Sequence, residues 1–194
     1  HEDTTFIQGF KLHRNTFFNE ETGTYSRFVS SHFFKDFFYA VLNVVLYQPE
    51  IPPNTGNIIR LCANTGARLH LVGPLGFVLD DARLKRAGLD YRDMAEVRQY
   101  AHWNAFTGQN TNMPLWAFST RGSVPYHEAG FRNGDGLLFG PESRGLPDDV
   151  LGGFPAARRL RLPMRLDSRS LNLSNTVAVG LYEGLRHLGF ENLS

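Results

Sequence analysis

The chain has 194 residues, of which 42% are hydrophobic and 20% are charged, and its formal net charge is +1. This length and composition suit one well-buried domain of a soluble protein and leave little room for two. No apolar run approaches the roughly 18 residues of a membrane span. The single cysteine, Cys62, excludes an intrachain disulfide, and we expect a cytoplasmic protein that does not associate with a membrane. We expect Cys62 to be a buried, unreactive thiol.

Residues 1–40 differ from the rest, because they hold nine of the 16 phenylalanines without a clear hydrophobic period. So many aromatic side chains argue against a permanently solvated tail. We expect a Phe-rich N-terminal extension of uncertain origin that packs on the domain or on a partner, or is foreign to the natural product. Val41 is compatible with an alternative initiation codon, and we hypothesise that translation starts there, with residues 41–194 forming the main domain.

From Val41 onward the sequence predicts alternating strands and helices, which is typical of an α/β fold with a parallel sheet flanked by helices. We expect about five or six strands. The strands are predicted at Val41–Tyr47, Ala67–Val72, Glu96–Tyr100, Leu115–Ser119 and Asp135–Phe139, with a short one ending at Leu160–Leu162. The helices are predicted at 54–66 with Asn54 as N-cap, at Asp80–Ala87, at His102–Phe106 and around Asp148–Leu151.

The clearest element is a helix over Asn172–Leu188, where apolar residues recur at 173, 177, 181, 185 and 188. This spacing puts them on one stripe of a helix. Ser170 and Asn172 are both N-cap candidates, and Gly189 stands where a C-terminal glycine belongs.

Three polar loops, 48–57, 140–147 and 163–174, each follow a predicted strand. Loops after the strands of a parallel sheet lie at its carboxyl edge, so all three can meet in one crevice. Any one of them fits a simple turn equally well, but three together favour a ligand site. The Gly-rich phosphate motifs, the nucleophile elbow, cysteine clusters and histidine pairs spaced for a metal are all absent from the sequence. We therefore expect no metal, and a nucleotide-binding hydrolase is disfavoured.

Seventeen of the 20 basic residues are arginine, which suits phosphates and stacked bases better than lysine does, although a GC-rich genome gives the same bias. The segment Arg83-Leu84-Lys85-Arg86 could follow a phosphate backbone. A solvated helix face explains it equally well.

The three loops also carry a resemblance. Residues 42–64, which include Ile51-Pro52-Pro53-Asn54-Thr55-Gly56-Asn57, resemble motif 1 of the SPOUT superfamily of trefoil-knotted RNA methyltransferases. Residues 138–147 resemble motif 2, and residues 162–175 resemble motif 3. The match runs from Leu42 to about Phe190, and the segment Asp80–Tyr91 is similar to the TrmL-type branch, compact tRNA (cytidine/uridine) 2′-O-methyltransferases that act at the wobble nucleotide. Residues 1–40 match nothing in that branch.

The resemblance implies a C-terminal trefoil knot, S-adenosylmethionine as cofactor, tRNA as substrate, and a homodimer formed through the helix Asn172–Leu188. It implies that the adenosine contacts are Phe118, Gly140, Leu162, Ser170 and Leu171, with Glu142 and Asn172 bracing the loops of the cofactor site. It assigns catalysis to Arg60, and we expect Asn54 to share that role. The candidates for RNA binding are Arg60, Arg83, Lys85, Arg86 and Arg144. A ribosomal RNA target, or a non-catalytic knotted protein that binds or assembles RNA, remains an alternative.

Arg60 is the residue that the resemblance sets at the ribose hydroxyl. A guanidinium, with a pKa above about 12, is a poor base at neutral pH. We therefore hypothesise that Arg60 orients the adjacent phosphate and stabilises the developing alkoxide, while water or another group accepts the proton. The alternative is that Arg60 only pairs with a carboxylate on its helix.

Overall fold

A computed structural model of the chain describes residues 42–78, 97–190 and 193, together with the backbone of four short strands before residue 27. The chain divides into two units, His1–Tyr39 and Ala40–Ser194. In the first unit, an antiparallel sheet has the order β1 (Phe6–Ile7), β2 (Phe10–His13), β3 (Thr16–Asn19) and β4 (Thr24–Ser26). No strand was predicted here, because these strands are only two to four residues long, at or below the shortest run over which alternation marks a strand.

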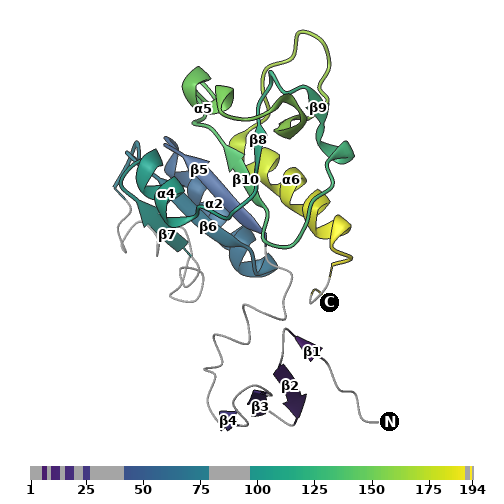
Figure 1. Ribbon diagram of the computed structural model, residues 1–194. Helices are drawn as coiled ribbons and strands as arrows, with labels where there is room; N and C mark the ends of the chain where they lie inside the picture. The colour runs from purple at the N-terminus through teal and green to yellow at the C-terminus, as the bar shows by residue number, and fades with distance from the viewer. Residues whose placement is uncertain are drawn as a thin grey trace. The chain divides into compact units, whose positions relative to one another are not determined.

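The second unit is built on a seven-stranded sheet in which every pairing is parallel (Figure 1). The strand order is β7-β6-β5-β10-β8-β11-β9. The strands are β5 (Asn43–Tyr47), β6 (Arg68–Val72), β7 (Val97–Tyr100), β8 (Leu115–Phe118), β9 (Val124–Pro125), β10 (Gly136–Phe139) and β11 (Arg159–Arg161). The predicted α/β parallel sheet is thus confirmed.

The number of strands was underestimated. The strand β9 has only two residues, one of them a proline that cannot donate to a ladder, so it gave no signal and lies at the edge of the sheet. The strand β11 is Arg159–Arg161, so its end was placed one residue too late.

Helices cover both faces of this sheet. They are α2 (Pro52–Thr65), α4 (Trp103–Gln109), α5 (Asp148–Gly152) and α6 (Leu173–His187), with 3-10 turns η1 (Tyr126–Glu128) and η2 (Ala156–Arg158). In β5, Val44 and Leu46 pack with α2 and α6 in one core cluster, whereas Val45 packs in a second cluster with residues of α4 and α5. Because β5 is buried on both faces, it is apolar except for Asn43, which is why this strand could be found from sequence.

The predicted helix over Asn172–Leu188 is confirmed as α6, which runs from Leu173 to His187 between its caps Asn172 and Leu188. The stripe at 173, 177, 181 and 185 is buried against the sheet. The Asn172 side chain accepts hydrogen bonds from the backbone N–H groups of Ser174 and Asn175, so Asn172 is the N-cap and Ser170 is not. A Cβ at Gly184 would come 2.6 Å from Leu42 Cδ1, so a glycine here lets the helix approach the sheet closely.

The bounds of two helices differ from the prediction, α2 at its start and α4 at its end. The helix α2 begins at Pro52 with Ile51 as its N-cap residue, so the expected cap at Asn54 was wrong. Proline fits the first turn of a helix because its missing N–H has no intrahelical partner there. The helix α4 runs on to Gln109, and His102 caps it by accepting from Ala105 N at 3.1 Å. The predicted helix Asp80–Ala87 lies outside the described residues.

Within the sheet, Asn43, His70, Tyr100 and Asn110 form what we call the interior network. Asn43 Oδ1 can only accept, so at 3.1 Å it requires a proton on His70 Nε2. His70 Nδ1 then accepts from the Tyr100 hydroxyl at 2.9 Å, and that oxygen accepts from Asn110 Nδ2 at 3.3 Å. Burial, aided by the charges of Arg98 and Arg68, lowers the pKa of His70 from 6.5 to about 4. The ring is therefore neutral at physiological pH.

Cys62 lies in the core on α2 and is 3% exposed. Burial raises the pKa of its thiol to about 12. The expected inert thiol agrees with this environment, because the thiolate is the reactive form.

Candidate cofactor and RNA site

A pocket of about 450 Å³ lies at the carboxyl edge of the sheet, where β8, β10 and β11 end and α2 and α6 begin. Its volume falls in the range of small-molecule sites. The structure brings together here most of the residues singled out in the sequence: Asn54, Phe118, Gly140, Glu142, Arg144, Leu162, Ser170, Leu171 and Asn172.

Arg60 is not on the wall of this pocket and lies exposed on α2. Arg83, Lys85 and Arg86, expected to bind RNA, lie outside the described residues.

A chain of hydrogen bonds ties the three polar loops together. The Glu142 carboxylate accepts from Glu50 N at 2.8 Å and Ile51 N at 3.2 Å, and from Asn54 Nδ2 at 3.0 Å. Asn54 Oδ1 in turn accepts from Asn172 Nδ2 at 2.9 Å. We call Asn54, Glu142 and Asn172 the edge network. Because Asn172 also caps α6, Asn54 on α2 connects directly to the start of α6 on one side and to the loop after β10 on the other.

A second carboxylate, that of Glu50, binds the loop after β10 in the same way as Glu142 binds the loop after β5. Glu50 accepts from Ser143 N at 3.0 Å and from its hydroxyl at 2.8 Å, and pairs with Arg144 Nη1 at 2.9 Å. The hydrogen bonds from Ser143, with a smaller contribution from Arg144, hold the pKa of Glu50 below its usual value. Arg144 Nη2 also donates to Gln48 Oε1 at 2.8 Å, so this arginine is held against the loop after β5.

The loop after β10 depends on two glycines. A Cβ at Gly140 would overlap the backbone of Gly145 and Leu146, because the loop doubles back on itself there. Gly145 has a φ of 68°, which favours glycine, and its N–H donates to Pro141 O at 2.9 Å. The turn therefore presents main-chain groups to the pocket.

The pocket has an apolar part at the end of β8. Phe118 stacks on Phe139 with ring centroids 4.6 Å apart, and Leu162 and Leu171 line the same pocket. Apolar side chains beside main-chain groups, hydroxyls and an amide suit a planar heterocycle joined to a sugar. The residues present therefore fit an adenosine-containing cofactor.

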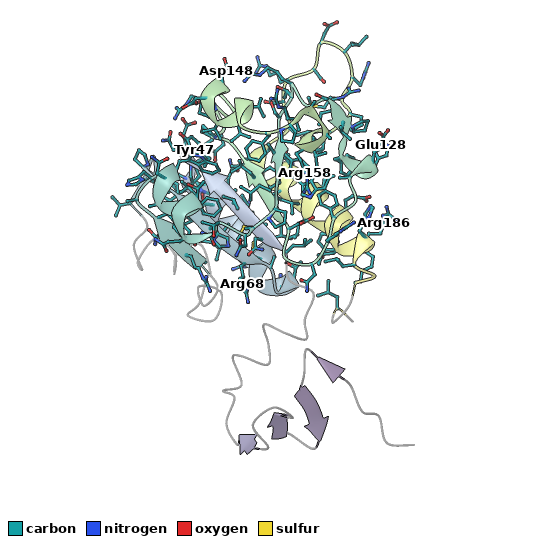
Figure 2. All side chains as sticks on the ribbon, viewed as in Figure 1. Tyr47, Arg68, Glu128, Asp148, Arg158 and Arg186 are labelled. Carbon is teal, nitrogen blue, oxygen red and sulfur yellow. The ribbon has the colours of Figure 1, made fainter. Side chains whose placement is uncertain are left out.

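The loop after β8 was missed by the sequence analysis. Ser119, Thr120 and Arg121 line the pocket, and Arg121 pairs with Asp148 Oδ1 at 2.6 Å and donates to Leu146 O at 3.3 Å. Figure 2 shows Asp148 on α5, far from Arg186 near the end of α6. The signal was available, because this loop also follows a parallel strand and so reaches the same edge. Asp148 begins α5, where the sequence predicted a short helix.

Across residues 42–78 and 97–190, the His, Cys, Asp and Glu side chains make no group of three that could hold a metal ion. None of the described helices has the length and apolar character needed to cross a bilayer.

Comparison with known proteins gives a consistent result. The SpoU rRNA Methylase family profile matches residues 41–182. The tRNA (cytidine(34)-2′-O)-methyltransferase of Burkholderia cenocepacia (strain HI2424) is 59% identical over 153 residues, which is 78% of this chain and 98% of the relative. A solved structure on the 2-OH methylation of C/U34 on tRNA is 49% identical, has a TM-score of 0.71, and covers 77% of this chain and 97% of its own. An AdoMet-bound rRNA methyltransferase from Sinorhizobium meliloti is 27% identical with a TM-score of 0.66, over 76% of this chain and 56% of that one.

Proposed function

Because the chain belongs to the SpoU rRNA Methylase family, we propose that it methylates the ribose 2′-oxygen of the cytidine or uridine at position 34 of tRNA, the wobble nucleotide. The relative named for this reaction shares 59% identity over almost its whole length. The observation that carries the proposal is the pocket at the carboxyl edge, where the edge network holds three loops together.

The methyl donor is S-adenosylmethionine, whose sulfonium supplies an electrophilic methyl group when the cofactor is bound. Phe118, Leu162 and Leu171 give apolar contacts to the adenosine, and the main chain at Gly140 and Ser170 meets its polar edge. Glu142 and Asn172 keep these loops in place. The AdoMet-bound rRNA methyltransferase, which has the same fold, supports this choice of cofactor.

We further propose that the chain is knotted near its C-terminus. Leu160 of β11 pairs with Phe118 on one side and with Val124 on the other, although only five residues separate β8 from β9. Within that connection, Ser119 N donates to Leu160 O and Ser123 N to Arg159 O, both at 2.9 Å. The connection between β8 and β9 therefore crosses over β11, which lies between them in the sheet. A knot requires such a crossing, because the chain at β11 must pass through the loop that this connection closes.

Arg60 and Asn54 are the proposed catalytic residues. Asn54 lines the pocket, whereas Arg60 does not, so a homodimer would supply the missing arginine from the second copy. The outward side of α6 supports such a dimer, because Val179 and Tyr182 are exposed and the Tyr182 ring lies near that of Phe190. Arg60 then orients a phosphate and stabilises the developing alkoxide.

The variant Arg60→Lys tests that role. It keeps the positive charge but loses the planar fork, so cofactor affinity by calorimetry should stay unchanged while turnover falls at least tenfold. Near-normal turnover would show that Arg60 does not have the catalytic role proposed for it.

Sedimentation of the wild-type protein at micromolar concentration tests the dimer and should give a dimer. A monomer that methylates tRNA at the normal rate would contradict a site shared between two copies.

The basic residues Arg83, Lys85 and Arg86, together with Arg144, are proposed to bind the tRNA backbone. The reaction itself is tested with bulk tRNA from a strain that lacks the gene, incubated with labelled S-adenosylmethionine and analysed by nucleoside mass spectrometry. We expect one 2′-O-methylated pyrimidine, at position 34. A parallel incubation uses ribosomal RNA from the same strain, and methylation of that RNA with none of tRNA would redirect the assignment. A protein that binds no cofactor in calorimetry would be a scaffold instead.

A further inference from the structure

The segment between β11 and α6, residues 163–172, is exposed along its whole length. We call it the rim loop. It projects beyond α5 at the top of Figure 1, in yellow-green. Met164, Ser170 and Leu171 line the pocket, so the loop stands at the mouth of the cofactor site. Any substrate that reaches that site passes close to it.

The guanidinium groups of this region are uncompensated. Arg161, Arg165 and Arg169 lie within nine residues of chain, and none of their side chains forms an ion pair or a hydrogen bond with a residue in the described ranges. The two arginines elsewhere on the pocket wall differ, because Arg121 is paired with Asp148 and Arg144 with Glu50. Uncompensated guanidinium groups beside a pocket suit an anionic partner.

The tip of the rim loop presents an apolar side chain between two of these charges. Ser168 donates to Arg165 O through its N–H at 3.2 Å and through its hydroxyl at 2.6 Å, which closes a turn. Asp167 has a φ of 64° in this turn, a conformation that Asp tolerates better than most residues. Leu166, the residue between, is 94% exposed.

The tip carries two arginines, Arg165 and Arg169, against one carboxylate, Asp167, so it keeps a net positive charge beside a bare apolar side chain. This combination matches one class of partner better than others. Single-stranded RNA offers phosphates at regular intervals and unstacked base faces between them. An apolar protein surface could cover Leu166, but it would provide no negative charge for the three arginines, Arg161, Arg165 and Arg169.

We propose that the rim loop is an RNA-contacting element of the enzyme: Arg165 and Arg169 bind phosphates of the single-stranded RNA segment that carries the target nucleotide, and Leu166 packs against one of its bases. This inference rests on the proposed function for the kind of RNA. It adds to the site a contact that lies directly beside the pocket.

The test uses full-length protein and tRNA that lacks the modification, with binding measured by fluorescence anisotropy between 50 and 200 mM salt. The double variant Arg165→Gln/Arg169→Gln should weaken tRNA binding at least tenfold. Its slope of log K against log[salt] should shrink by about 1.4, since each single-strand phosphate contact contributes about 0.7. Calorimetry should give an unchanged affinity for S-adenosylmethionine.

Leu166→Ser should weaken tRNA binding about threefold to tenfold without changing the salt slope, because a base contact releases no counterions. The control is Arg132→Gln. Arg132 is exposed and lies just before β10, at the opposite edge of the sheet, and this variant should bind as the wild type does.

The proposal is overturned if the double variant binds tRNA within twofold of the wild type with the same salt slope. It is also overturned if only the cofactor affinity falls, because the loop would then be a cover for the cofactor. A shift in oligomeric state on Leu166→Ser would assign that residue to a protein interface. Each of these results leaves wild-type methylation of tRNA intact, whereas failure of the wild type to bind or methylate tRNA would defeat the proposed function itself.

Discussion

The molecule contains two networks of hydrogen-bonded polar side chains that lie in different parts of the fold. The interior network of Asn43, His70, Tyr100 and Asn110 joins three neighbouring strands and the end of α4, and none of its residues lines the pocket. The edge network joins three loops, and all of its residues line the pocket. Both satisfy buried polar groups, such as His70 in the first and Asn54 in the second. What separates them is their position relative to the carboxyl ends of the strands, so we expect the first to govern stability and the second to govern activity.

The largest expected effect is the response of the interior network to acid. The pKa of His70 is about 4 in the fold and 6.5 as the ordinary value. Between these pH values the unfolded chain binds more protons, so stability is lost as pH falls from about 6.5 to 4, by up to about 3 kcal/mol. Urea unfolding at pH 7 and pH 4.5 measures this.

The matched control is His70→Gln, which removes the titrating group and keeps an amide that can donate and accept. Its unfolding free energy should fall less between the two pH values than that of the wild type. Equal losses in both proteins would show that other groups, such as carboxylates, cause the acid sensitivity.

The next effect concerns the edge network and should appear in activity. Glu142→Gln replaces an acceptor of three hydrogen bonds by an amide whose NH₂ would face N–H donors. We expect kcat/KM to fall about 30-fold, equivalent to about 2 kcal/mol, with weaker cofactor binding. Glu128→Gln, at an exposed acid on η1, is the control and should be neutral. A Glu142→Gln enzyme with normal kcat/KM would mean that the loops hold their positions without this carboxylate.

The sequence predicted the elements whose signals are local. The stripe on α6, the apolar strands and the three polar loops all follow from the order of residues alone. The convergence of the loops followed from one general rule about parallel sheets. Arg121 obeys the same rule and could have been found by applying it to the loop after β8.

Other features depend on pairs of residues far apart in the chain, which one sequence does not reveal. The Asn54 side chain was expected to cap its own helix, but it bonds Glu142, 88 residues away, and Asn172, 118 residues away. His70 carried no signal of its partners Asn43 and Tyr100, because they lie on neighbouring strands. The placement of Arg60 outside the pocket also follows only from the fold.

A smaller effect, on stability alone, is expected when the interior network is changed by mutation at constant pH. Tyr100→Phe removes the hydroxyl that donates to His70 Nδ1 and accepts from Asn110. The free energy of unfolding should drop by about 1 kcal/mol, the usual net value of such a hydrogen bond. Affinity for S-adenosylmethionine, measured by calorimetry on the folded protein, should stay unchanged. A weakened affinity would mean that the interior network also influences the pocket, so that the two networks would not have separate roles in stability and activity.

The smallest effect is expected at Glu50, which lies beside the edge network. In Glu50→Gln the amide oxygen can still accept from Ser143 N, and the change removes the charge pair with Arg144, whose side chain is 55% exposed. Exposed pairs contribute little and are screened by salt, so kcat/KM should fall less than about threefold, and raising the salt should reduce the difference. The lowered pKa of Glu50 means that its charged form, and the pairing with it, persists until pH falls below the ordinary carboxylate range. A fall in kcat/KM as large as that of Glu142→Gln would make Glu50 a fourth member of the edge network, because both carboxylates would then be needed to hold the loops together.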